Sequence, residues 1–330
     1  MIITKTPFRI SYLGGGTDFP EWYLRNSGKV ISSSIDKFNF VTLRNLQNIF
    51  NYKFRIRYYY NERCENVKDI KHPTVRNLIN LYKIKNVELI NYSDLVAMSG
   101  IGSSSAFTVG LLKAILEIKK KRLKPIDLAK KAINVERNLN KDYVGCQDQF
   151  ACAFGGLNSI RFSKKNIKVT NLSMYKKNAN MIDQSTLLLF TKIHRNSAIP
   201  TKELITQMKF GKINNHLERL KTLADEGERI IKSNKFDNKI FGEILNESWE
   251  LKKNCSKKIT NNTIDYITNI AKKNGAFASK VIGAGGGGFM IIYAEKKFHK
   301  NIKKKLNKFD FIDFNFTNEG VTTIFNSQEL

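Results

Sequence analysis

The sequence predicts an α+β fold in two domains, and three observations lead to this prediction. Residues 1 to about 60 are rich in β-branched and aromatic residues separated by turns, which is typical of a sheet. The second half instead carries long amphipathic helical periodicities, so strands and helices are largely segregated along the chain. A length of 330 residues is enough for two hydrophobic cores. We expect the boundary within 180–200, which divides the chain into domains 1–185 and 186–330.

Elements of the first half follow from local composition. Pro73 and Pro125 each fall in the first turn of a helix, where proline is tolerated because the missing N–H has no helical partner. Gly155 and Gly156 end a short helix that begins at Gln147. In chain order we expect strands 31–43 and 54–60, a helix 72–80, a strand 87–91, helices 104–120, 125–139 and 147–154, and a strand 156–162.

The second half begins with an expected strand over 186–191. Two further strand-like runs, 276–282 and 289–294, flank a glycine-rich turn, and a Lys-rich helix and more strands close the chain. The helical periodicities predict three long helices, over about 202–234, 238–255 and 262–274.

Composition excludes several classes of protein. A hydrophobic content of 42 % and an aromatic content of 11 % indicate a globular chain. The longest apolar runs, such as 186–190, are far too short to span a membrane, and the N-terminus lacks a signal-peptide pattern. We therefore expect a cytoplasmic protein with no membrane partner. The four cysteines form no C-x-x-C pair and the four histidines have no ligand spacing, so we expect reduced thiols and no zinc site.

The net charge of +27 raises the question of nucleic-acid binding. Lys and Asn are abundant throughout the chain, however, and runs such as 119–121 and 303–305 fall at helix ends or on solvated helix faces. The sequence contains no basic ribbon interleaved with aromatic residues and no zinc finger. We expect no nucleic-acid partner, and salt-dependent binding to duplex DNA would test the alternative. The charge excess can instead attract anionic small molecules.

A loop of glycine and serine precedes the apolar run 107–118. Small residues that lead into a helix N-terminus leave backbone N–H groups free, and the helix dipole favours an anion there. No Lys follows the second glycine, so the loop is not a Walker A motif. A serine-capped core helix would explain the stretch equally well. The candidate phosphate-binding residues are Gly100, Ile101, Gly102, Ser103, Ser104, Ser105 and Ala106.

Two other glycine-rich stretches favour the phosphate interpretation. The first, 14–18, follows a strand-like run that contains Pro7 and Arg9. The second, 283–288, formally matches G-x-G-x-x-G, but it lies near the C-terminus and leads into a strand, so we interpret it as a hairpin turn rather than a dinucleotide site. Three such turns suggest that several backbone segments close around one polyanionic ligand.

These three motifs, in this order, resemble those of the GHMP family of small-molecule kinases. The family has a P-x-R/K strand leading to a glycine turn, a central G-L-G-S-S-A loop and a C-terminal G-x-G-x-G-G loop, and the resemblance covers nearly the whole chain. The resemblance implies that the N-terminal half folds like domain 2 of ribosomal protein S5 and binds ATP. It implies a ferredoxin-like fold for the C-terminal half. It also implies ATP and Mg²⁺ as cofactors.

Glu136 is the carboxylate that the helical pattern marks most clearly. It lies four residues after Ala132 and eight after Leu128, so it borders or joins the apolar face of its helix. A buried carboxylate needs a cation or hydrogen bonds, and either Mg²⁺ or a Lys or Arg partner would supply them. The resemblance implies that Ser104 and Glu136 hold Mg²⁺, and it leaves the role of Ser105 open.

Asp148 and Arg9 are the expected catalytic residues. The Asp-Gln pair at 148–149 resembles the Met-Asp-Gln segment of galactokinases, in which the Asp faces the sugar hydroxyl. The resemblance implies that Asp148 accepts the proton of the attacking hydroxyl, while Arg9 keeps it ionised and stabilises charge on the transferring group. An Asp that merely starts a helix is the alternative.

The resemblance also implies substrate contacts. Asp18 is expected to accept hydrogen bonds from sugar hydroxyls, although an Asp in a turn frequently bonds its own backbone. Galactokinases have Glu and His where this chain has Gly15 and Gly16, so its sugar contacts should differ. Arg195 lies in a segment resembling Thr-Gly-x-x-Arg-x-Ser without its glycine, and a solvated loop Arg is the alternative. The expected substrate-binding residues are Gly15, Gly16, Thr17, Asp18, Arg195, Lys280, Gly285, Gly286 and Gly287.

The first motif resembles most the branch of the family that phosphorylates the anomeric hydroxyl of heptose 7-phosphate. It implies an ATP-dependent sugar 1-kinase that forms the 1,7-bisphosphate of D-glycero-D-manno-heptose for nucleotide-activated heptose in capsule or other surface polysaccharide. Another GHMP kinase, of the fucose, galactose or mevalonate type, and a non-catalytic sugar sensor on the same fold are the alternatives. The expected partner is a small phosphorylated sugar, and the oligomeric state stays open, with a homodimer among the options.

Overall fold

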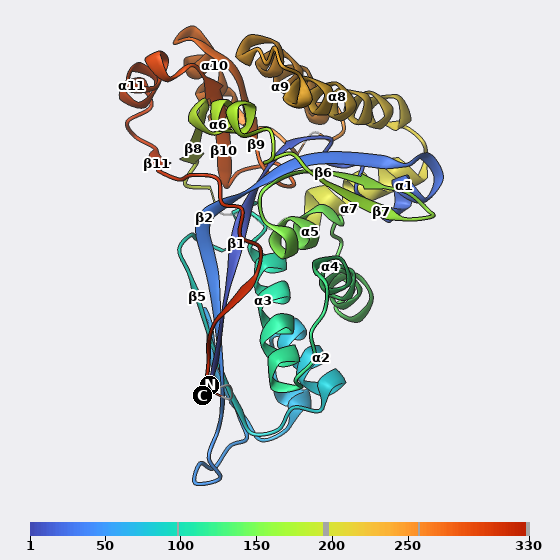
Figure 1. Cartoon of the computed structure of the whole chain (residues 1–330), viewed down its shortest axis with the longest axis vertical. Coiled ribbons are helices and arrows are strands. Elements are labelled where there is room, and N and C mark those ends of the chain that lie inside the picture. Colours follow the sequence, from blue (N-terminus) through green and yellow to red (C-terminus); the bar gives the residue numbers. More distant parts are fainter. Residues whose placement is uncertain (98, 194–197, 257, 328–330) are drawn as a thin grey trace.

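The computed structural model describes residues 1–97, 99–193, 198–256 and 258–327. Within these ranges the strands form two sheets, one of eight strands and one of four, and Figure 1 shows helices packed against both. This is the α+β arrangement that the sequence predicts. No helix among the described residues has both the length and the apolar character needed to cross a membrane.

The larger sheet is built around β2, an 18-residue strand. β1 runs antiparallel to β2 over almost its whole length, the first part of β2 pairs with β6, and its last part pairs with β5. β12 pairs with β1 on the other side. The strands of this sheet are β1 (Ile2–Leu13), β2 (Gly28–Asn45), β3 (Phe54–Arg57), β4 (Asn61–Cys64), β5 (Val87–Ser93), β6 (Leu157–Phe162), β7 (Ile167–Asn171) and β12 (Thr322–Asn326).

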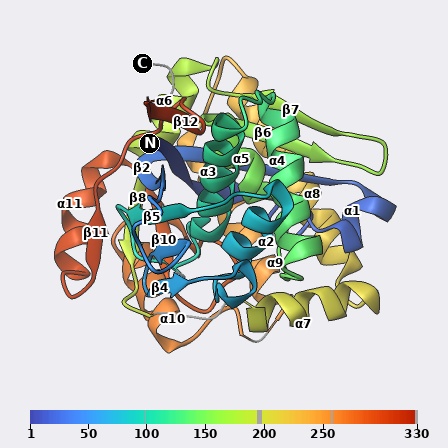
Figure 2. The same ribbon diagram turned by 90° about the horizontal axis from the view of Figure 1, so that it is seen from below.

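The smaller sheet has the order β11-β8-β10-β9. Its strands are β8 (Thr186–Phe190), β9 (Ala276–Val281), β10 (Phe289–Ala294) and β11 (Asp310–Ile312). β9 and β10 are antiparallel, so the third glycine-rich stretch connects a hairpin, as predicted. The first strand of this sheet begins at Thr186, next to the expected domain boundary. The last strand of the chain, β12, does not join this sheet but pairs with β1 of the larger one. β12 therefore lies beside the N-terminus (Figure 2), and Ser327 N donates to Met1 O at 2.9 Å.

The helices cover the sheets in two groups. In Figure 1, α2 to α5 lie against one face of the larger sheet, and α3 packs directly on β1 and β2. α8 packs on β1 and β2 nearer the smaller sheet, and α9 packs on β9 and β10. The helices are α1 (Pro20–Asn26), α2 (Pro73–Tyr82), α3 (Ser103–Ile118), α4 (Pro125–Asn134), α5 (Gln147–Phe154), α6 (Lys176–Gln184), α7 (Ala198–Lys209), α8 (Asn214–Lys232), α9 (Asn238–Lys253), α10 (Asn262–Lys273) and α11 (Lys296–Lys305), with a short 3₁₀ turn at Val67–Asp69.

Several predicted elements need correction. The helix expected over 202–234 is two helices, α7 and α8, because Gly211 adopts a left-handed φ of +69° and interrupts the hydrogen-bond ladder. α1 lies within the stretch expected to be strands and turns, and it begins at Pro20. α6 and β7 were not predicted. The helix expected over 125–139 is α-helical only to Asn134 and continues as a π-helical turn, Val135–Leu139.

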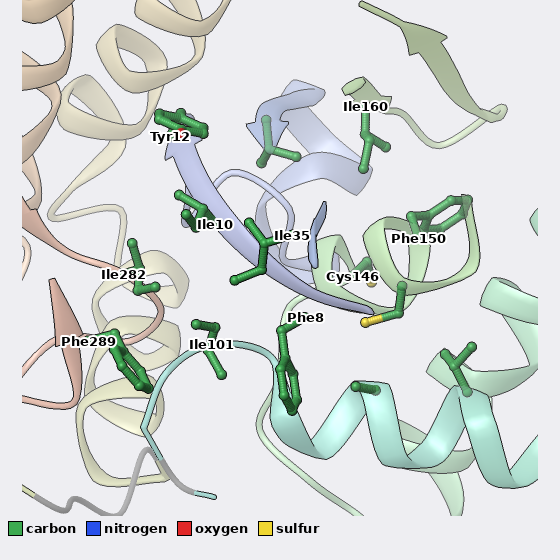
Figure 3. Close-up of a cluster of buried hydrophobic side chains, with 14 of the residues drawn as sticks. Phe8, Ile10, Tyr12, Ile35, Ile101, Cys146, Phe150, Ile160, Ile282 and Phe289 are labelled. Atoms are coloured by element: carbon green, nitrogen blue, oxygen red, sulfur yellow. The ribbon is translucent and has the colours of Figure 1, made fainter. Parts of the chain in front are cut away.

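One hydrophobic core joins the two sheets behind the glycine-rich turns. Figure 3 shows Ile101 of the serine loop between Phe8 of β1 and Phe289 of β10, with Ile282 beside them. All four side chains are at most 1 % exposed. Burial of these residues from three distant segments stabilises the fold and brings the serine loop next to the third glycine turn.

An ion-pair cluster fixes α8 on the larger sheet. The Lys29 side chain is buried, and its Nζ lies 2.6 Å from Asp225 Oδ1 and also contacts Glu228. The backbone N–H and C=O of Lys29 both bond to Thr17 Oγ1, at 3.0 and 2.9 Å. Lys29 thus connects α8 to the first glycine turn. Burial alone would raise the pKa of Glu228, but hydrogen bonds from Lys232, Lys29 and Ser159 lower it to about 2.

The lowered pKa of Glu228 predicts a pH-dependent contribution to stability. Because the folded pKa lies below the unfolded value, the stabilisation is present above about pH 4.5 and is lost as the pH falls toward 2. We expect Glu228→Gln to reduce the free energy of unfolding by about 1–3 kcal/mol at pH 7. The difference from wild type should shrink between pH 5 and pH 2, as measured by urea unfolding.

The matched control is Glu218→Gln on the same helix, whose exposed carboxylate pairs with Lys221. This variant should stay within about 0.5 kcal/mol of wild type at every pH. A Glu228→Gln deficit that is constant from pH 5 to pH 2 would contradict the assignment.

Candidate active site

A buried ion pair lies at the centre of the site. Arg9 on β1 is 3 % exposed, and its Nε and Nη2 donate to Asp148 Oδ1 and Oδ2, each at 2.7 Å. Its remaining nitrogen, Nη1, donates to the carbonyl oxygen of Gly100 at 2.8 Å. Asp148 lies in the first turn of α5. Bidentate charge-assisted bonds compensate the loss of hydration, so this one side chain joins β1, the serine loop and α5.

The serine loop can only adopt this arrangement with glycine at position 102. Gly102 has a left-handed φ of +80°, and a Cβ there would lie 3.3 Å from Arg9 Cγ and 3.5 Å from Asp148 Oδ2. The first intrahelical bond of α3 runs from Ala106 N to Gly102 O at 2.9 Å. The N–H groups of the three serines at 103–105 therefore precede the helical ladder, which suits them to bind an anion.

Not every residue of the predicted phosphate loop faces a ligand. Gly100, Gly102 and Ser103–Ser105 line a cavity. Ile101 and Ala106 have fully buried side chains outside the cavity lining, and Figure 3 shows Ile101 pointing into the hydrophobic core. These two residues anchor the loop, so their predicted ATP contacts can involve only their backbone.

Glu136 is fully buried beneath the serine loop. Its Oε2 accepts hydrogen bonds from Ser105 Oγ at 3.0 Å and from Gln149 Nε2 at 2.6 Å, whereas Oε1 has no partner among the described residues. Burial raises the pKa of Glu136 to about 7, although the hydrogen bonds from Gln149 and Ser105 oppose the rise. A buried carboxylate oxygen without a partner fits a cation, and Mg²⁺ prefers such hard oxygen ligands.

The structure gives Ser105, whose role the sequence leaves open, a contact with Glu136 through its hydroxyl. Ser104 is exposed and lines the cavity, so its predicted metal contact stays a prediction that depends on a ligand entering from that side. Glu136 itself lies on the π-helical turn, closed by Asn140 N donating to Val135 O at 2.9 Å, and such turns are frequent at functional sites.

The first glycine turn presents Gly15, Gly16 and Asp18 to the cavity. Asp18 is 5 % exposed and accepts bonds from Gly16 N at 3.1 Å and from Gln147 N at 3.0 Å. Burial, and then the nearby Asp148 carboxylate, raise the pKa of Asp18. Thr17 is fully buried and bonds Gly14 O and Lys29 O, so it holds the turn and does not line the cavity.

The third glycine turn contributes only its beginning. Gly283 and Ala284 line the cavity, whereas Gly285, Gly286 and Gly287 do not. A Cβ on Gly285 would lie 2.8 Å from Ile259 Cα, and Gly286 N donates to Ile259 O at 2.7 Å. A Cβ on Gly287 would lie 2.7 Å from Ile193 Cγ2. These three glycines permit close backbone packing, so their predicted substrate contacts have no support in the cavity lining.

Two lysines lie beside this turn. Lys280 is 3 % exposed, donates to Tyr12 O and lies outside the cavity lining. Burial, and then the charges of Lys252 and Arg9, lower its pKa well below the ordinary value. Lys252 of α9 does line the cavity and donates to Gly283 O. Arg195, the remaining predicted substrate residue, lies outside the described residues.

Sequence reasoning gave no role to several polar residues of the site, among them Ser11, Gln147, Gln149 and Lys252. Ser11 Oγ donates to Gln147 Oε1 at 2.9 Å, and Gln147 Nε2 donates to Asp148 Oδ1 at 3.2 Å. Gln147 and Gln149 flank Asp148 in the chain, and that adjacency was an available signal. No sequence signal marks Ser11 or Lys252 as a site residue, because Ser11 is a single serine in a strand and Lys252 is one of several lysines in its helix.

The cavity brings the three glycine turns together. Its volume is about 220 Å³, below the roughly 300–1,000 Å³ of pockets for drug-sized ligands, so it suits a small acceptor. Its polar lining includes Asp148, Arg9, the serines and Asp18. Further lining residues come from α7, α8, α9 and the segments around them, and they are Pro200, Thr201, Leu204, Leu217, Leu220, Lys252, Cys255 and Ile259.

Family models and a curated relative match the sequence of this chain. Residues 69–156 match the model of the GHMP kinases N terminal domain, and residues 230–310 match that of the GHMP kinases C terminal region. The chain is 31 % identical to a D-glycero-alpha-D-manno-heptose 7-phosphate kinase from Campylobacter jejuni, over 97 % of this chain and 98 % of that protein.

Solved structures show the same fold. A putative sugar kinase from Campylobacter jejuni has 28 % identity and a TM-score of 0.69, with 98 % of this chain and 97 % of that chain covered. A D-glycero-D-manno-heptose 1-phosphate kinase from Bacteroides thetaiotaomicron has 24 % identity and a TM-score of 0.78, with 98 % of both chains covered.

The two matched regions contain the features described above. The N-terminal match includes the serine loop, Glu136 and Asp148, and the C-terminal match includes α9 and the third glycine turn. The chain belongs to the GHMP kinase family, and it is an ATP-dependent phosphotransferase with an alcohol group as acceptor.

Proposed function

We propose that this protein is an ATP- and Mg²⁺-dependent sugar 1-kinase that converts D-glycero-D-manno-heptose 7-phosphate to the 1,7-bisphosphate. The observation that carries the proposal is the Arg9–Asp148 pair on the wall of a cavity that all three glycine turns border. The 31 % identity to a heptose 7-phosphate kinase supports the substrate. The product would supply nucleotide-activated heptose for capsule or other surface polysaccharide.

Asp148 is the residue that receives the proton of the attacking hydroxyl. Its Oδ1 accepts from Arg9 and Gln147, whereas Arg9 is the one partner that the described residues give Oδ2. Oδ2 therefore has a lone pair available for the acceptor hydroxyl. Arg9 holds the carboxylate in place and places positive charge beside the transferring phosphoryl group.

The serine loop and Glu136 would hold the phosphates and the metal ion. The N–H groups at the start of α3 bind the phosphate oxygens of ATP. Ser104 from the cavity side and Glu136 through its unpartnered Oε1 would hold Mg²⁺, which supplies charge neutralisation on the phosphates when bound.

An acceptor panel tests the substrate. ADP release is measured with heptose 7-phosphate, fucose, galactose and mevalonate at equal concentrations. We expect the highest kcat/KM with the phosphorylated heptose. A higher kcat/KM with fucose, galactose or mevalonate would show that the protein is a kinase of that type instead. No turnover with any of the four acceptors would favour a non-catalytic sugar sensor.

Asp148→Asn should lower kcat by about 10²- to 10⁴-fold, because the amide cannot accept the hydroxyl proton. ATP affinity, measured by calorimetry, should stay within about threefold of wild type, since this side chain does not form the phosphate loop. The control is Asp183→Asn on α6, a half-buried carboxylate that accepts a bond from Phe316 N outside the cavity. A near wild-type rate for Asp148→Asn would show that the base is wrongly assigned.

Glu136→Gln should lower kcat by about 100-fold or more, because the amide is a poor ligand for Mg²⁺. The amide keeps the shape and can still accept bonds from Ser105 and Gln149, so the fold should persist. The measurement is the Mg²⁺ concentration that gives half-maximal rate, which should rise. Glu117→Gln, a partly buried carboxylate on α3 that pairs with Lys113, is the control. An unchanged Mg²⁺ dependence would remove Glu136 from the metal site.

A further inference from the structure

Gly15 is a glycine that neither the backbone nor its neighbours require. Gly14 and Gly16 on either side have left-handed φ values of +74° and +107°, whereas Gly15 lies outside that region. A Cβ on Gly15 would meet its nearest atoms, Ser11 Oγ and Lys252 Nζ, at 3.5 and 3.9 Å, which is ordinary van der Waals contact. Alanine could therefore occupy this position without a clash. Gly15 lines the cavity, where the hydroxyl of Ser11 and the ammonium group of Lys252 lie beside it.

Lys252 brings positive charge to this space. Its Nζ donates to Gly283 O, so the ammonium group is held between the first and third glycine turns. Lys252 Nζ would lie 3.9 Å from a Cβ on Gly15, and Lys252 is the lysine among the described residues that line the cavity. Asp148 and Asp18 are the carboxylates among the residues that line the cavity. Asp148 pairs with Arg9, and Asp18 accepts backbone N–H bonds.

We propose that the space over Gly15 receives the phosphate group that the acceptor already carries, and that Lys252 thereby determines specificity for phosphorylated over unphosphorylated acceptors. This inference rests on the proposed function. An ammonium group offers three donors and compensates the charge of a phosphate. Lys252 on α9 and Asp148 on α5 both line the cavity, so one acceptor can meet both, with its phosphate at Lys252 and its hydroxyl at Asp148.

The phosphates of ATP could also bind Lys252. Kinetic measurements can distinguish binding of the acceptor's phosphate from binding of ATP. The full-length enzyme is assayed with heptose 7-phosphate and with the unphosphorylated heptose, at saturating and at varied ATP. We expect Lys252→Met to lower kcat/KM for the phosphorylated acceptor on the order of 10- to 100-fold. The ratio of kcat/KM for the two acceptors should fall by a similar factor, while the KM for ATP changes little.

Two control variants accompany this experiment, one at Lys252 and one at the adjacent Lys253. Lys252→Arg keeps the charge and should retain most of the preference for the phosphorylated acceptor. Lys253→Met removes the adjacent lysine, which pairs with Glu250 at 2.6 Å, and should leave the ratio unchanged. A loss of preference in Lys253→Met as large as that in Lys252→Met would overturn the inference, because it would reflect overall charge.

Gly15 provides an independent test of the same space. Gly15→Glu places a carboxylate beside Lys252, so it should lower kcat/KM for the phosphorylated acceptor much more than for the unphosphorylated one. Gly15→Ala adds only a methyl group, so it should affect the two acceptors about equally. Equal losses with both acceptors in Gly15→Glu would contradict a phosphate position there.

The outcomes also distinguish the inference from the proposed function. If wild type prefers heptose 7-phosphate and Lys252→Met keeps that preference, or raises only the KM for ATP, the inference fails and the proposed function stands. If wild type turns over no phosphorylated sugar, both fail.

Discussion

The buried guanidinium of Arg9 is the interaction on which the site depends. A cation with 3 % exposure is destabilising unless its hydrogen bonds are satisfied, and here they go to the Asp148 carboxylate and to the carbonyl oxygen of Gly100. These bonds tie β1, the serine loop and α5 to one another. In the proposed reaction they fix the position of Asp148, the proposed base, relative to the serine loop, which lowers the reorganisation needed during the reaction.

The glycines of the three turns serve two different purposes. Gly102 and Gly285 allow neighbouring groups to approach so closely that a Cβ would lie 3.3 Å from Arg9 Cγ or 2.8 Å from Ile259 Cα. Gly15 instead lines the cavity, and a Cβ there would make only ordinary van der Waals contacts. The third turn is further fixed by Phe289 N donating to Ser99 O at 2.8 Å, which joins it to the segment before the serine loop. Most glycines here shape the backbone, and few leave room for a ligand.

Local sequence patterns predicted much of the fold and part of the site. Proline and glycine mark the ends of α4 and α5, and the 3.6-residue periodicity placed Glu136 on a buried face, where it lies. The same periodicity continues across Gly211, which is why two helices were predicted as one. The contact of Ser105 with Glu136 and the position of Lys252 could not be predicted, because they depend on how distant helices pack. Local sequence patterns do not show which distant helices pack against each other.

The return of β12 to the first sheet has a consequence for how this protein is made. β12 covers the outer edge of β1 at Ile2–Lys5, yet the ribosome synthesises it about 300 residues after that strand. Until β12 has been made, this part of β1 is an open strand edge, and exposed strand edges promote association between chains. The N-terminal sheet can therefore be completed only late in synthesis, after most of the second half of the chain has been made.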